Sequence, residues 1–364
     1  MPRFLHTSDW QLGLKLRFVP GENGAQARLA RFDTVRRIAE LAKEHLAEAV
    51  VVAGDVFDDN AVGPDTLQRT RDALAVFAPL PVLLLPGNHD AGEPGGALER
   101  LAPLEHGLDH VELLLDPAPR RQGGLTFYPC PLTRRHTFED PTASLPNRDD
   151  REEVRVAVAH GGILDFGEST ESPNRIDAEA VLAKGFDYLA LGDWHGTFHL
   201  GPRIWYSGTP EPTRFEEKDP GNVLLVEIEG PGAPPKVEPL PVAWARWLRE
   251  ARSLGGEEDL ESLSTWLKAL PEKSRTLLEL TLEGSLSLSQ RSRLEEVLRT
   301  AAGQLLHLRL RQDALILQPS EADLDRLELE GFVGRAVEEL KSEGSAEAKE
   351  ALFLLYRLLG EVGS

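Results

Sequence analysis

The sequence predicts an α/β fold in which two β-sheets pack face to face as a sandwich flanked by helices, followed by a small α/β cap domain and a helical C-terminal tail. Three observations lead to this prediction. Short apolar runs typical of buried strands alternate with segments of helical periodicity. Later extended segments are separated by prolines and glycines, as in hairpins of a second sheet. Several apolar runs end directly in Asp, Asn or His, where open α/β sheets place functional groups.

Composition narrows the class of protein. The chain has 364 residues, enough for two or three domains, and a net charge of -20 that argues against general affinity for nucleic acid. No apolar run approaches the length of a spanning helix, and the N-terminal segment lacks the apolar core and cleavage site of a signal peptide. The single cysteine, Cys130, excludes an intrachain disulfide and is expected to be buried. We therefore expect a cytoplasmic protein without membrane association.

The first part of the chain predicts alternating strands and helices. Segments 49–53 and 81–86 are apolar and are expected to be buried strands of a covered sheet, and segment 3–8 is expected to be a short strand. Segments 26–46 and 65–77 repeat apolar residues with helical spacing. This β-α-β-α-β order implies parallel strands joined by right-handed crossovers. Arginines crowd the first helix and favour either a solvated face or a patch that steers phosphates: Arg28, Arg31, Arg36 and Arg37.

The middle of the chain predicts a second set of strands with one helix at 176–184. The expected strands are 111–115, 125–130, 154–159, 186–191, 203–206 and 222–229. Segment 230–241 contains five prolines and two glycines, which indicates either a linker or an excursion at a sheet edge. We place the end of the first domain, residues 1–240, in this segment.

The rest of the chain predicts a small α/β domain, residues 245–319, and a helical segment, residues 320–364. The small domain is expected to contain helices and strands at 260–270, 276–282, 289–302, 305–310 and 314–317. Helices at 324–341 and 346–359 are expected to follow. The last helix has an apolar stripe, which suits either docking on its own domain or binding a partner: Leu352, Leu355, Tyr356 and Leu359.

Polar side chains follow five of the predicted strands at the point where each strand ends. They are Asp9, Gln11, Asp55, Asn88, His89, His160, Asp193 and His195. Gathering carboxylates in a protein interior is costly unless cations compensate. Mixed carboxylate, amide and imidazole ligands suit two Mn²⁺, Fe or Zn²⁺ ions, and a carboxylate such as Asp55 can bridge them. Two such ions activate water for displacement at phosphorus, so the pattern predicts metal-assisted phosphoester hydrolysis.

Five short motifs in this order resemble those of the calcineurin-like metallophosphoesterases. They are Asp9-x-Gln11, GDVFD from Gly54, GNHD from Gly87, HGG from His160 and GDWH from Gly192. The surrounding segments HTSDWQLG and SGTPEP resemble those of the DNA-repair exonuclease branch of this family, which includes the SbcD nuclease subunit. The resemblance covers residues 1–230. It implies a metallophosphoesterase fold and a nuclease active in DNA repair and recombination.

The resemblance also implies roles for individual residues. Asp9 and His195 would bind a first metal, Asp55 would bridge, and a second metal would be bound by Asn88, His160 and Asp193. His89 would contact the phosphate and assist departure of the leaving oxygen, with Asp90 or Asp58 as candidate supporting carboxylates. The implied cofactors are two divalent ions, with Mn²⁺ expected. The implied partners are DNA, an SbcC-type SMC-like ATPase subunit and a second copy of the chain.

Two positions depart from the family pattern, which has His where this chain has Gln11 and Asp193. An amide oxygen is a weaker, neutral donor than imidazole, so the first metal is expected to be held loosely. Asp193 adds negative charge and favours a harder ion such as Mn²⁺ or Mg²⁺. Three functions therefore remain open: a DNA exo- or endonuclease with an ATPase partner, a phosphodiesterase acting on a small nucleotide-like molecule, and a weakly active regulatory subunit with an incomplete metal site.

Overall fold

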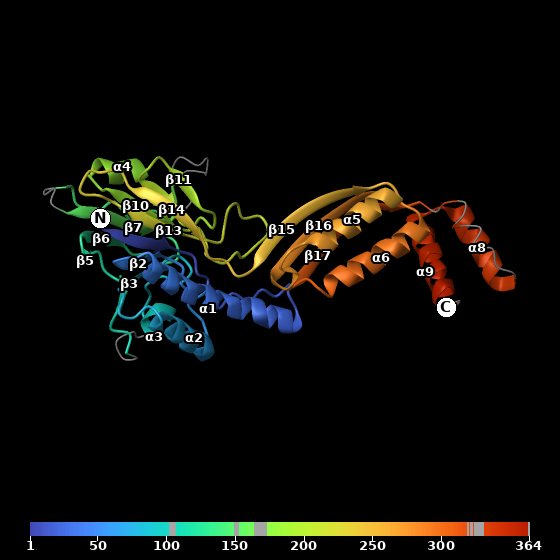
Figure 1. The fold of residues 1–364 in the computed structure, drawn as a ribbon, viewed down its shortest axis with the longest axis horizontal. Coiled ribbons are helices and arrows are strands. Elements are labelled where there is room, and N and C mark those ends of the chain that lie inside the picture. The colour runs from blue at the N-terminus through green and yellow to red at the C-terminus, as the bar shows by residue number, and fades with distance from the viewer. Residues whose placement is uncertain are drawn as a thin grey trace. The chain divides into compact units, whose positions relative to one another are not determined.

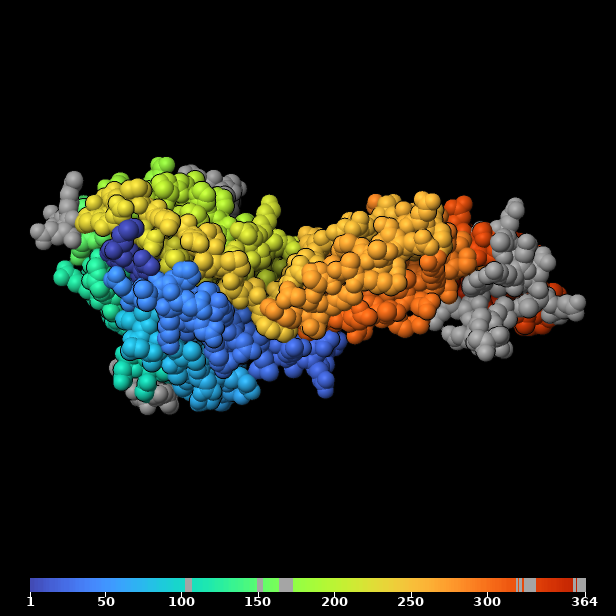
Figure 2. Space-filling view, in the orientation of Figure 1, coloured from blue at the N-terminus to red at the C-terminus, as the bar shows by residue number. Residues whose placement is uncertain are grey.

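The computed structural model describes residues 1–101, 107–148, 153–163, 173–318, 320, 323 and 331–362. The chain forms two compact units, Met1–Ala245 and Arg246–Ser364. The first unit runs from blue to yellow and the second from yellow to red in the ribbon and space-filling views (Figures 1 and 2). Within the described residues, the structure contains no helix long and apolar enough to cross a membrane.

The first unit is built on two six-stranded sheets, which confirms the predicted two-sheet α/β class. One sheet has the order β14 (Lys236–Pro241), β13 (Asn222–Glu227), β1 (Arg3–Thr7), β2 (Ala49–Ala53), β3 (Val82–Leu85) and β4 (Val111–Leu113). The other has the order β11 (Phe198–Leu200), β12 (Ile204–Tyr206), β10 (Tyr188–Gly192), β7 (Val154–His160), β6 (Leu125–Cys130) and β5 (Arg120–Gln122). A short pair, β8 (Gly162–Ile163) and β9 (Arg175–Ile176), is separate.

Strand β2 shows why this sequence forms a sandwich. All five of its residues are buried, and their side chains alternate between two cores. Val50 and Val52 pack in the core that includes α1 (Gly21–Glu44) and α2 (Pro64–Ala75). Val51 packs instead with residues of both sheets, such as Leu83 in its own sheet and Phe127 in the other. Because both faces are covered, each buried valine stabilises the fold by about 1.5–3 kcal/mol. Helix α3 (Ala97–Leu101) packs in the same core as α1 and α2, and α4 (Ala178–Ala183) packs in a third core with residues of the second sheet.

The proline-rich segment 230–241 contains an edge strand. Residues Lys236–Pro241 form β14 and pair antiparallel with β13 along its whole length. Of the two interpretations of this segment, the edge excursion is therefore correct and the linker is wrong. The prolines fit because an edge strand leaves one side of its backbone without ladder hydrogen bonds. The first unit continues through Trp244 and Ala245, whose backbone N–H groups donate to the buried carboxylate of Glu211.

The arginines of α1 have different environments. Arg31 is buried and donates to the backbone carbonyls of Trp10 and Pro212, so neither sequence interpretation applies to it. Arg36 pairs with Asp33 on the same helix, and Arg37 pairs in the same way with two glutamates of α1. These pairs are consistent with a solvated helix face.

The second unit contains a three-stranded parallel sheet with the order β15 (Arg246–Leu254), β16 (Thr276–Leu286) and β17 (His307–Leu317). Helix α5 (Glu257–Ala269) joins the first two strands, and α6 (Leu288–Ala302) joins the last two. The sequence interpretation missed β15. It also predicted two strands, 305–310 and 314–317, where the structure has the single strand β17, so this prediction was wrong. A shift in register opposite Thr281 and Glu283 explains the apparent break, since an irregularity interrupts the apolar pattern without ending the strand.

Two helices follow, α8 (Gly331–Glu343) and α9 (Ala346–Val362). The first part of the helix expected at 324–341, residues 324–330, lies outside the described residues, as do the side chains of Tyr356 and Leu359. Leu352 and Phe353 of α9 pack in one apolar cluster with Leu288 and Val337, so the last helix docks on its own unit. Leu354 and Leu358 of the same helix are more than half exposed.

Candidate metal centre

The predicted site residues meet where strands of both sheets end. Strands β1, β2 and β3 run parallel in one sheet, and β7 and β10 run parallel in the other. Backbone hydrogen bonds join the first two strand ends, since the Asp9 N–H donates to the Gly54 carbonyl at 3.0 Å and the Gln11 N–H donates to the Asp55 carbonyl at 3.0 Å. The carboxyl ends of these strands thus form one edge, as expected for a site in an α/β sheet.

Three buried side chains form the centre of this edge. One ligand atom from each of Asp9, Asp55 and His160 lies within 4.8 Å of the other two. The Asp55 Oδ1 atom is 3.5 Å from His160 Nε2. Two carboxylates and an imidazole at this spacing, all removed from water, form a donor set that fits a divalent cation.

The surroundings of His160 support the same conclusion. Its Nδ1 atom is 2.9 Å from the Ala53 carbonyl, which holds the Nδ1–H tautomer and leaves the lone pair on Nε2. That Nε2 atom faces oxygen atoms of Asn88 at 2.8 Å, Asp55 at 3.5 Å and Asp193 at 3.7 Å. The lone pairs of a neutral imidazole nitrogen and of three oxygens repel one another at these distances. A proton or a metal ion between them supplies the positive charge that relieves this repulsion.

The pKa values of the central groups respond to this arrangement. Burial raises the pKa of Asp9 to about 6, although His195 and His160 oppose the shift. Burial also acts against a charge on His160, but Asp55, Asp9 and Asp193 outweigh it and raise the pKa of His160 to about 9. The raised pKa of His160 indicates that the carboxylates around it carry more negative charge than the neighbouring side chains neutralise, whereas the raised pKa of Asp9 reflects its removal from water.

Asp193 and His195 reach the centre from the loop after β10. The Asp193 N–H donates to both carboxylate oxygens of Asp9 at 3.2 Å. The His195 Nε2 atom is 3.9 Å from Asp9 Oδ1, while its Nδ1 atom is 2.7 Å from Glu217 Oε1. Glu217 thereby fixes the ring with Nε2 toward Asp9, an arrangement typical of metal-binding histidines.

Gln11 lies beside the centre and supports Asp55. Its side-chain Nε2 donates to Asp55 Oδ2 at 2.8 Å. In this orientation the amide holds the carboxylate in place, and a half-turn of the amide would present its oxygen instead. The His89 N–H donates to the other oxygen, Asp55 Oδ1, at 2.9 Å. Both oxygens of Asp55 are therefore oriented by neighbours on different strand ends.

The three predicted catalytic residues occupy different environments. His89 is about one-third exposed, and its Nδ1 atom is 2.7 Å from the Asp58 backbone carbonyl, so Nε2 is directed toward the site, 3.9 Å from Asp55 Oδ2. Asp58 thus contacts His89 through its backbone. Asp90 is buried and accepts hydrogen bonds from the N–H groups of Gly87 at 2.8 Å and Phe57 at 3.0 Å. These contacts of Asp90 hold two strand-end loops together.

The backbone at the site is unusual. Four of the predicted ligand residues have positive φ: Asp9 at 52°, Gln11 at 49°, Asp55 at 54° and Asp193 at 98°. Residues other than glycine rarely adopt this backbone conformation, and such strain concentrates at functional sites. The chain also comes so close at Gly54 that an added Cβ would lie 2.1 Å from His160 Nδ1. Glycine is required there by both its φ and its neighbour.

Sequence reasoning missed several residues that hold the site. Ser8 donates to Asp9 Oδ2, and Glu217 orients His195. Thr213 donates to Glu217 through its backbone N–H at 3.0 Å, and Thr209 donates through its hydroxyl to the Asp9 carbonyl at 2.8 Å. The motif SGTPEP, which includes Thr209, was a signal for part of this set, whereas nothing in the local sequence distinguishes Glu217 from its neighbour Glu216.

A groove of about 750 Å³ opens beside the centre. It is lined by the loop that follows Gln11, by residues near Asp58 and by Thr213. Lys15 and Arg17 bring positive charge to its wall, and Phe18 brings an aromatic ring. Asp58 and Asp59 line the same groove, so its wall carries both signs of charge and offers room beside the centre without a surplus of positive charge.

Comparisons with known proteins agree with the geometry. The family model for calcineurin-like phosphoesterases matches residues 2–226, which contain all the predicted site residues. The chain is similar to the SbcD subunit of the nuclease SbcCD from Staphylococcus saprophyticus. The two are 25% identical over 264 residues, covering 65% of this chain and 69% of that protein.

Proposed function

Because the chain belongs to the calcineurin-like phosphoesterase family, we propose that it is a metal-dependent phosphodiesterase that cleaves DNA as an exo- or endonuclease in repair and recombination. The observation that supports this most strongly is the position of His160 Nε2, which faces an amide oxygen of Asn88 and carboxylate oxygens of Asp55 and Asp193. The similarity to a protein named as a nuclease subunit supports DNA as the substrate.

We assign the ligands to two ions. Asp9 and His195 would hold the first, with Gln11 beside it, and Asp55 would bridge. The second would be held by Asn88, His160 and Asp193. Oxygen donors outnumber nitrogen donors in this set, which favours Mn²⁺. When bound, the two ions would supply Lewis acidity to the phosphate and lower the pKa of a water molecule.

The protein's own groups prepare this site. The Ala53 carbonyl and Glu217 each fix one histidine so that its other nitrogen faces the centre. Gln11 and the His89 N–H orient the two oxygens of Asp55. These contacts hold ligands in place before the substrate arrives, and such outer contacts are worth about 10- to 100-fold in metal affinity or activity.

His89 is the proposed acid for the leaving oxygen. Its Nδ1–H donates to the Asp58 carbonyl, so a proton on Nε2 would be directed into the site. A positioned imidazole contributes about 10²–10⁴-fold to a rate when it protonates a poor leaving group. Asp58 would support His89 through this backbone contact, which fixes the direction of the ring. Asp90 would act indirectly, through the loop that it holds.

The proposal extends to the rest of the chain. We assign residues 1–240 to the nuclease domain, 245–319 to a small capping or DNA-binding domain, and 320–364 to a segment that binds a partner. Leu354 and Leu358 on α9 are 51% and 58% exposed, which suits a protein contact. The first proposed partner is an SbcC-type SMC-like ATPase, because the similar protein is named as a subunit of SbcCD. A second copy of the chain is the other proposed partner.

Two alternatives each have an observation in their favour. The net charge of -20 favours a small nucleotide-like substrate over a long polyanion. The orientation of the Gln11 amide nitrogen toward Asp55 favours a weakly active regulatory subunit, since no amide oxygen is then offered to an ion.

One experiment separates these functions. Purified protein is incubated with Mn²⁺ and plasmid DNA, oligonucleotides, bis-p-nitrophenyl phosphate or cyclic nucleotides, and His160→Ala is the inactive control. We expect cleavage of DNA that depends on Mn²⁺ and disappears in the control together with metal binding. Hydrolysis restricted to cyclic nucleotides would establish the small-substrate alternative. Absence of hydrolysis of every substrate, with metal bound, would establish the regulatory one.

A further inference from the structure

The guanidinium of Arg31 is buried inside the first unit and joins two loops of the metal centre. The side chain extends from the middle of α1 and is only 2% exposed, although removing a charge from water is costly. Its Nε and Nη2 atoms donate to the Trp10 carbonyl at 3.1 and 2.9 Å. Its Nη1 atom donates to the Pro212 carbonyl at 3.1 Å. One planar group therefore ties together two loops that are far apart in the sequence.

The first of these loops carries two of the predicted metal ligands. Trp10 lies between Asp9 and Gln11, and both of these neighbours have positive φ, at 52° and 49°. Residues other than glycine keep such a conformation only where their surroundings fix it. The two hydrogen bonds from Arg31 fix the peptide group that joins Trp10 to Gln11. Arg31 thereby supports the direction in which this loop presents its ligands.

The second loop holds the histidine on the other side of the centre. The residue after Pro212 is Thr213, whose N–H donates to Glu217 Oε2 at 3.0 Å. Glu217 in turn orients His195 through its Oε1 atom. The Pro212 carbonyl and the Thr213 N–H belong to the same peptide group. Arg31 therefore holds from the oxygen side the peptide group that Glu217 holds from the nitrogen side, and hydrogen bonds linked in this way strengthen one another.

Glu211 supplies a counter-charge for the buried guanidinium. Its carboxylate is 3% exposed and accepts a hydrogen bond at 2.7 Å from the hydroxyl of Thr34, one turn along α1 from Arg31. Burial lowers the pKa of Arg31, and the negative charge of Glu211 opposes this shift. An arginine nonetheless keeps its charge at every relevant pH. Arg31 thus has two roles that an experiment must separate, balancing a buried charge and holding two carbonyls.

We propose that Arg31 is a positioning residue for the metal centre, which holds the loop of Asp9 and Gln11 and the peptide group behind His195 in the geometry that binds metal. The inference rests on the proposed function and gives α1 a part in the site, although α1 contains none of the five motifs. Arg31 acts through backbone groups and not on the reacting atoms. A rigid, planar guanidinium suits this task because it donates in two directions at a fixed angle.

The test compares metal affinity with stability, because a purely structural arginine would alter only the stability. Full-length Arg31→Met is freed of metal, its melting temperature is measured, and it is titrated with Mn²⁺ in a calorimeter. The Mn²⁺ affinity should fall about 10- to 100-fold, as for other contacts that hold metal ligands in place. The melting temperature should fall by on the order of 10 °C, because Glu211 loses its counter-charge. Wild-type affinity in the folded variant would overturn the proposal.

A second variant removes the unpaired charge that Arg31→Met leaves behind. In Arg31→Met/Glu211→Gln the neutral glutamine needs no counter-charge, so the melting temperature should rise toward that of wild type. The Mn²⁺ affinity should stay reduced, because methionine cannot donate to the Trp10 carbonyl. Recovery of wild-type affinity would show that Arg31 serves only as a counter-charge and would overturn the proposal.

A third variant decides the question if neither methionine variant folds. Arg31→Lys keeps the charge beside Glu211 but lacks the planar fork, so it should fold and bind Mn²⁺ about three- to tenfold more weakly than wild type. Wild-type affinity of a folded Arg31→Lys protein would show that charge alone is sufficient, and would also overturn the proposal.

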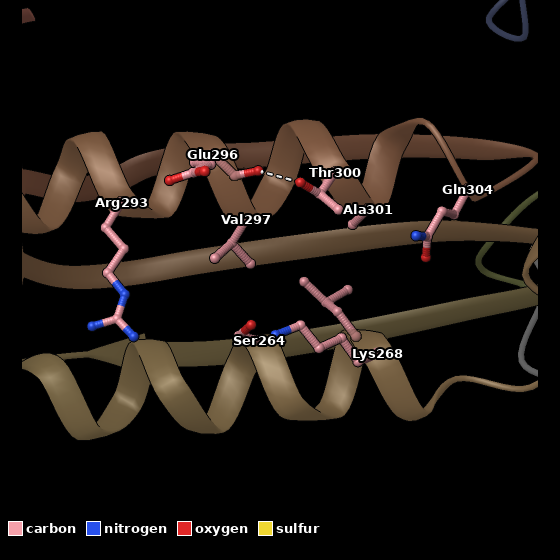
Figure 3. A pocket seen from close by; sticks show the side chains of 9 residues that line it. Ser264, Lys268, Arg293, Glu296, Val297, Thr300, Ala301 and Gln304 are labelled. Carbon is pink, nitrogen blue, oxygen red and sulfur yellow. Dashed lines mark hydrogen bonds between the residues drawn. The ribbon is translucent and has the colours of Figure 1, made fainter. Parts of the chain in front are cut away.

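Two other arginines provide matched controls. Arg155 on β7 is also 2% exposed and donates to two backbone carbonyls, but it lies about 16 Å along the strand from His160. Arg155→Met should lower the melting temperature and leave the Mn²⁺ affinity unchanged; an equal loss of affinity would overturn the proposal. Arg293 reaches from α6 toward α5 in a groove of the second unit that Lys268 also lines (Figure 3). Arg293→Met corrects for the change in net charge.

The outcomes distinguish this inference from the proposed function. If wild type binds Mn²⁺ and cleaves DNA while the Arg31 variants bind Mn²⁺ equally tightly, the inference fails and the proposed nuclease remains. If the variants lose Mn²⁺ affinity as expected but wild type hydrolyses no phosphodiester, the role of Arg31 in metal binding stands and the proposed function fails. If wild type binds no Mn²⁺, both fail.

Discussion

Glu217 provides the sharpest test of how the metal centre is held. Its Oε1 atom lies 2.7 Å from His195 Nδ1, its side chain is 2% exposed, and its Oε2 atom accepts from the Thr213 N–H at 3.0 Å. Burial acts against its charge, but the hydrogen bonds from His195 and Thr213 lower the pKa of Glu217. The carboxylate is therefore ionised and fixed on both sides.

Replacing Glu217 by alanine should loosen the ring of His195 without removing a metal ligand. A hydrogen bond to a charged group contributes about 1.5–3 kcal/mol, and each 1.4 kcal/mol is tenfold in affinity. The Mn²⁺ affinity of the first site should therefore fall about 10- to 100-fold. Glu217→Gln should show a smaller loss of affinity, because the amide oxygen can still accept the hydrogen bond from His195. Some loss should remain, because the NH₂ group of the glutamine would face the Thr213 N–H, and two donors cannot form a hydrogen bond.

The assay is calorimetric titration of the metal-free protein with Mn²⁺, which reads affinity directly. Glu216→Ala is the matched control, since it removes the same charge from the adjacent exposed position. The reasoning would be refuted by a folded Glu217→Ala protein with wild-type affinity, or by an equal loss in the Glu216→Ala control. High Mn²⁺ should restore hydrolysis in Glu217→Ala, because the ligands themselves are intact.

Three further predictions follow from other parts of the structure. His89→Ala should keep its metal and lose about 10²–10⁴-fold of DNA cleavage, with a much smaller loss on bis-p-nitrophenyl phosphate, whose leaving group needs no proton; loss of metal would make His89 a ligand. Gln11→His should raise hydrolysis at low Mn²⁺, and an unchanged metal dependence would show that Gln11 does not limit the site. His6 is buried, and burial lowers its pKa from 6.5 to about 3. The unfolded chain therefore binds a proton that the folded chain does not as pH falls from 6.5 toward 3, and at pH 5 this costs about 2 kcal/mol; thermal melts of His6→Gln should show a weaker loss of stability between pH 6.5 and 5, and a parallel loss would contradict it.

The sequence predicted the central strands of the first unit well because they are continuous apolar runs, whereas the short strands β5 and β11 at the edges of the second sheet were missed. Strand β2 was identified to the residue, since all five of its side chains are buried in covered faces. Strand β15 was missed because charged residues interrupt its apolar pattern on both faces: Arg249 pairs with Glu279, whereas Arg252 lies over the ring of Trp266 in α5. Local patterns predict a strand only where burial is the main requirement on its side chains.

The residues of the candidate metal centre were predicted from strand ends, but the contacts that support them were not. Asp90 follows His89 in the sequence, which suggested direct support, yet its carboxylate turns to the backbone of Gly87 and Phe57. Glu217 orients His195 across 22 positions of sequence. Such contacts depend on where loops pass one another in space, and neither periodicity nor a short motif encodes that.

The positive φ angles at Asp9, Gln11, Asp55 and Asp193 restrict which replacements these positions tolerate. Asparagine and aspartate occupy the left-handed region more readily than alanine does, which loses about 1–2 kcal/mol there. An alanine scan of the centre would therefore report backbone cost together with the loss of a ligand. Asp→Asn exchanges preserve the turn and isolate the effect of charge. Variation among natural sequences at these four positions should accordingly favour Asn, Asp, His and Gly over the aliphatic residues.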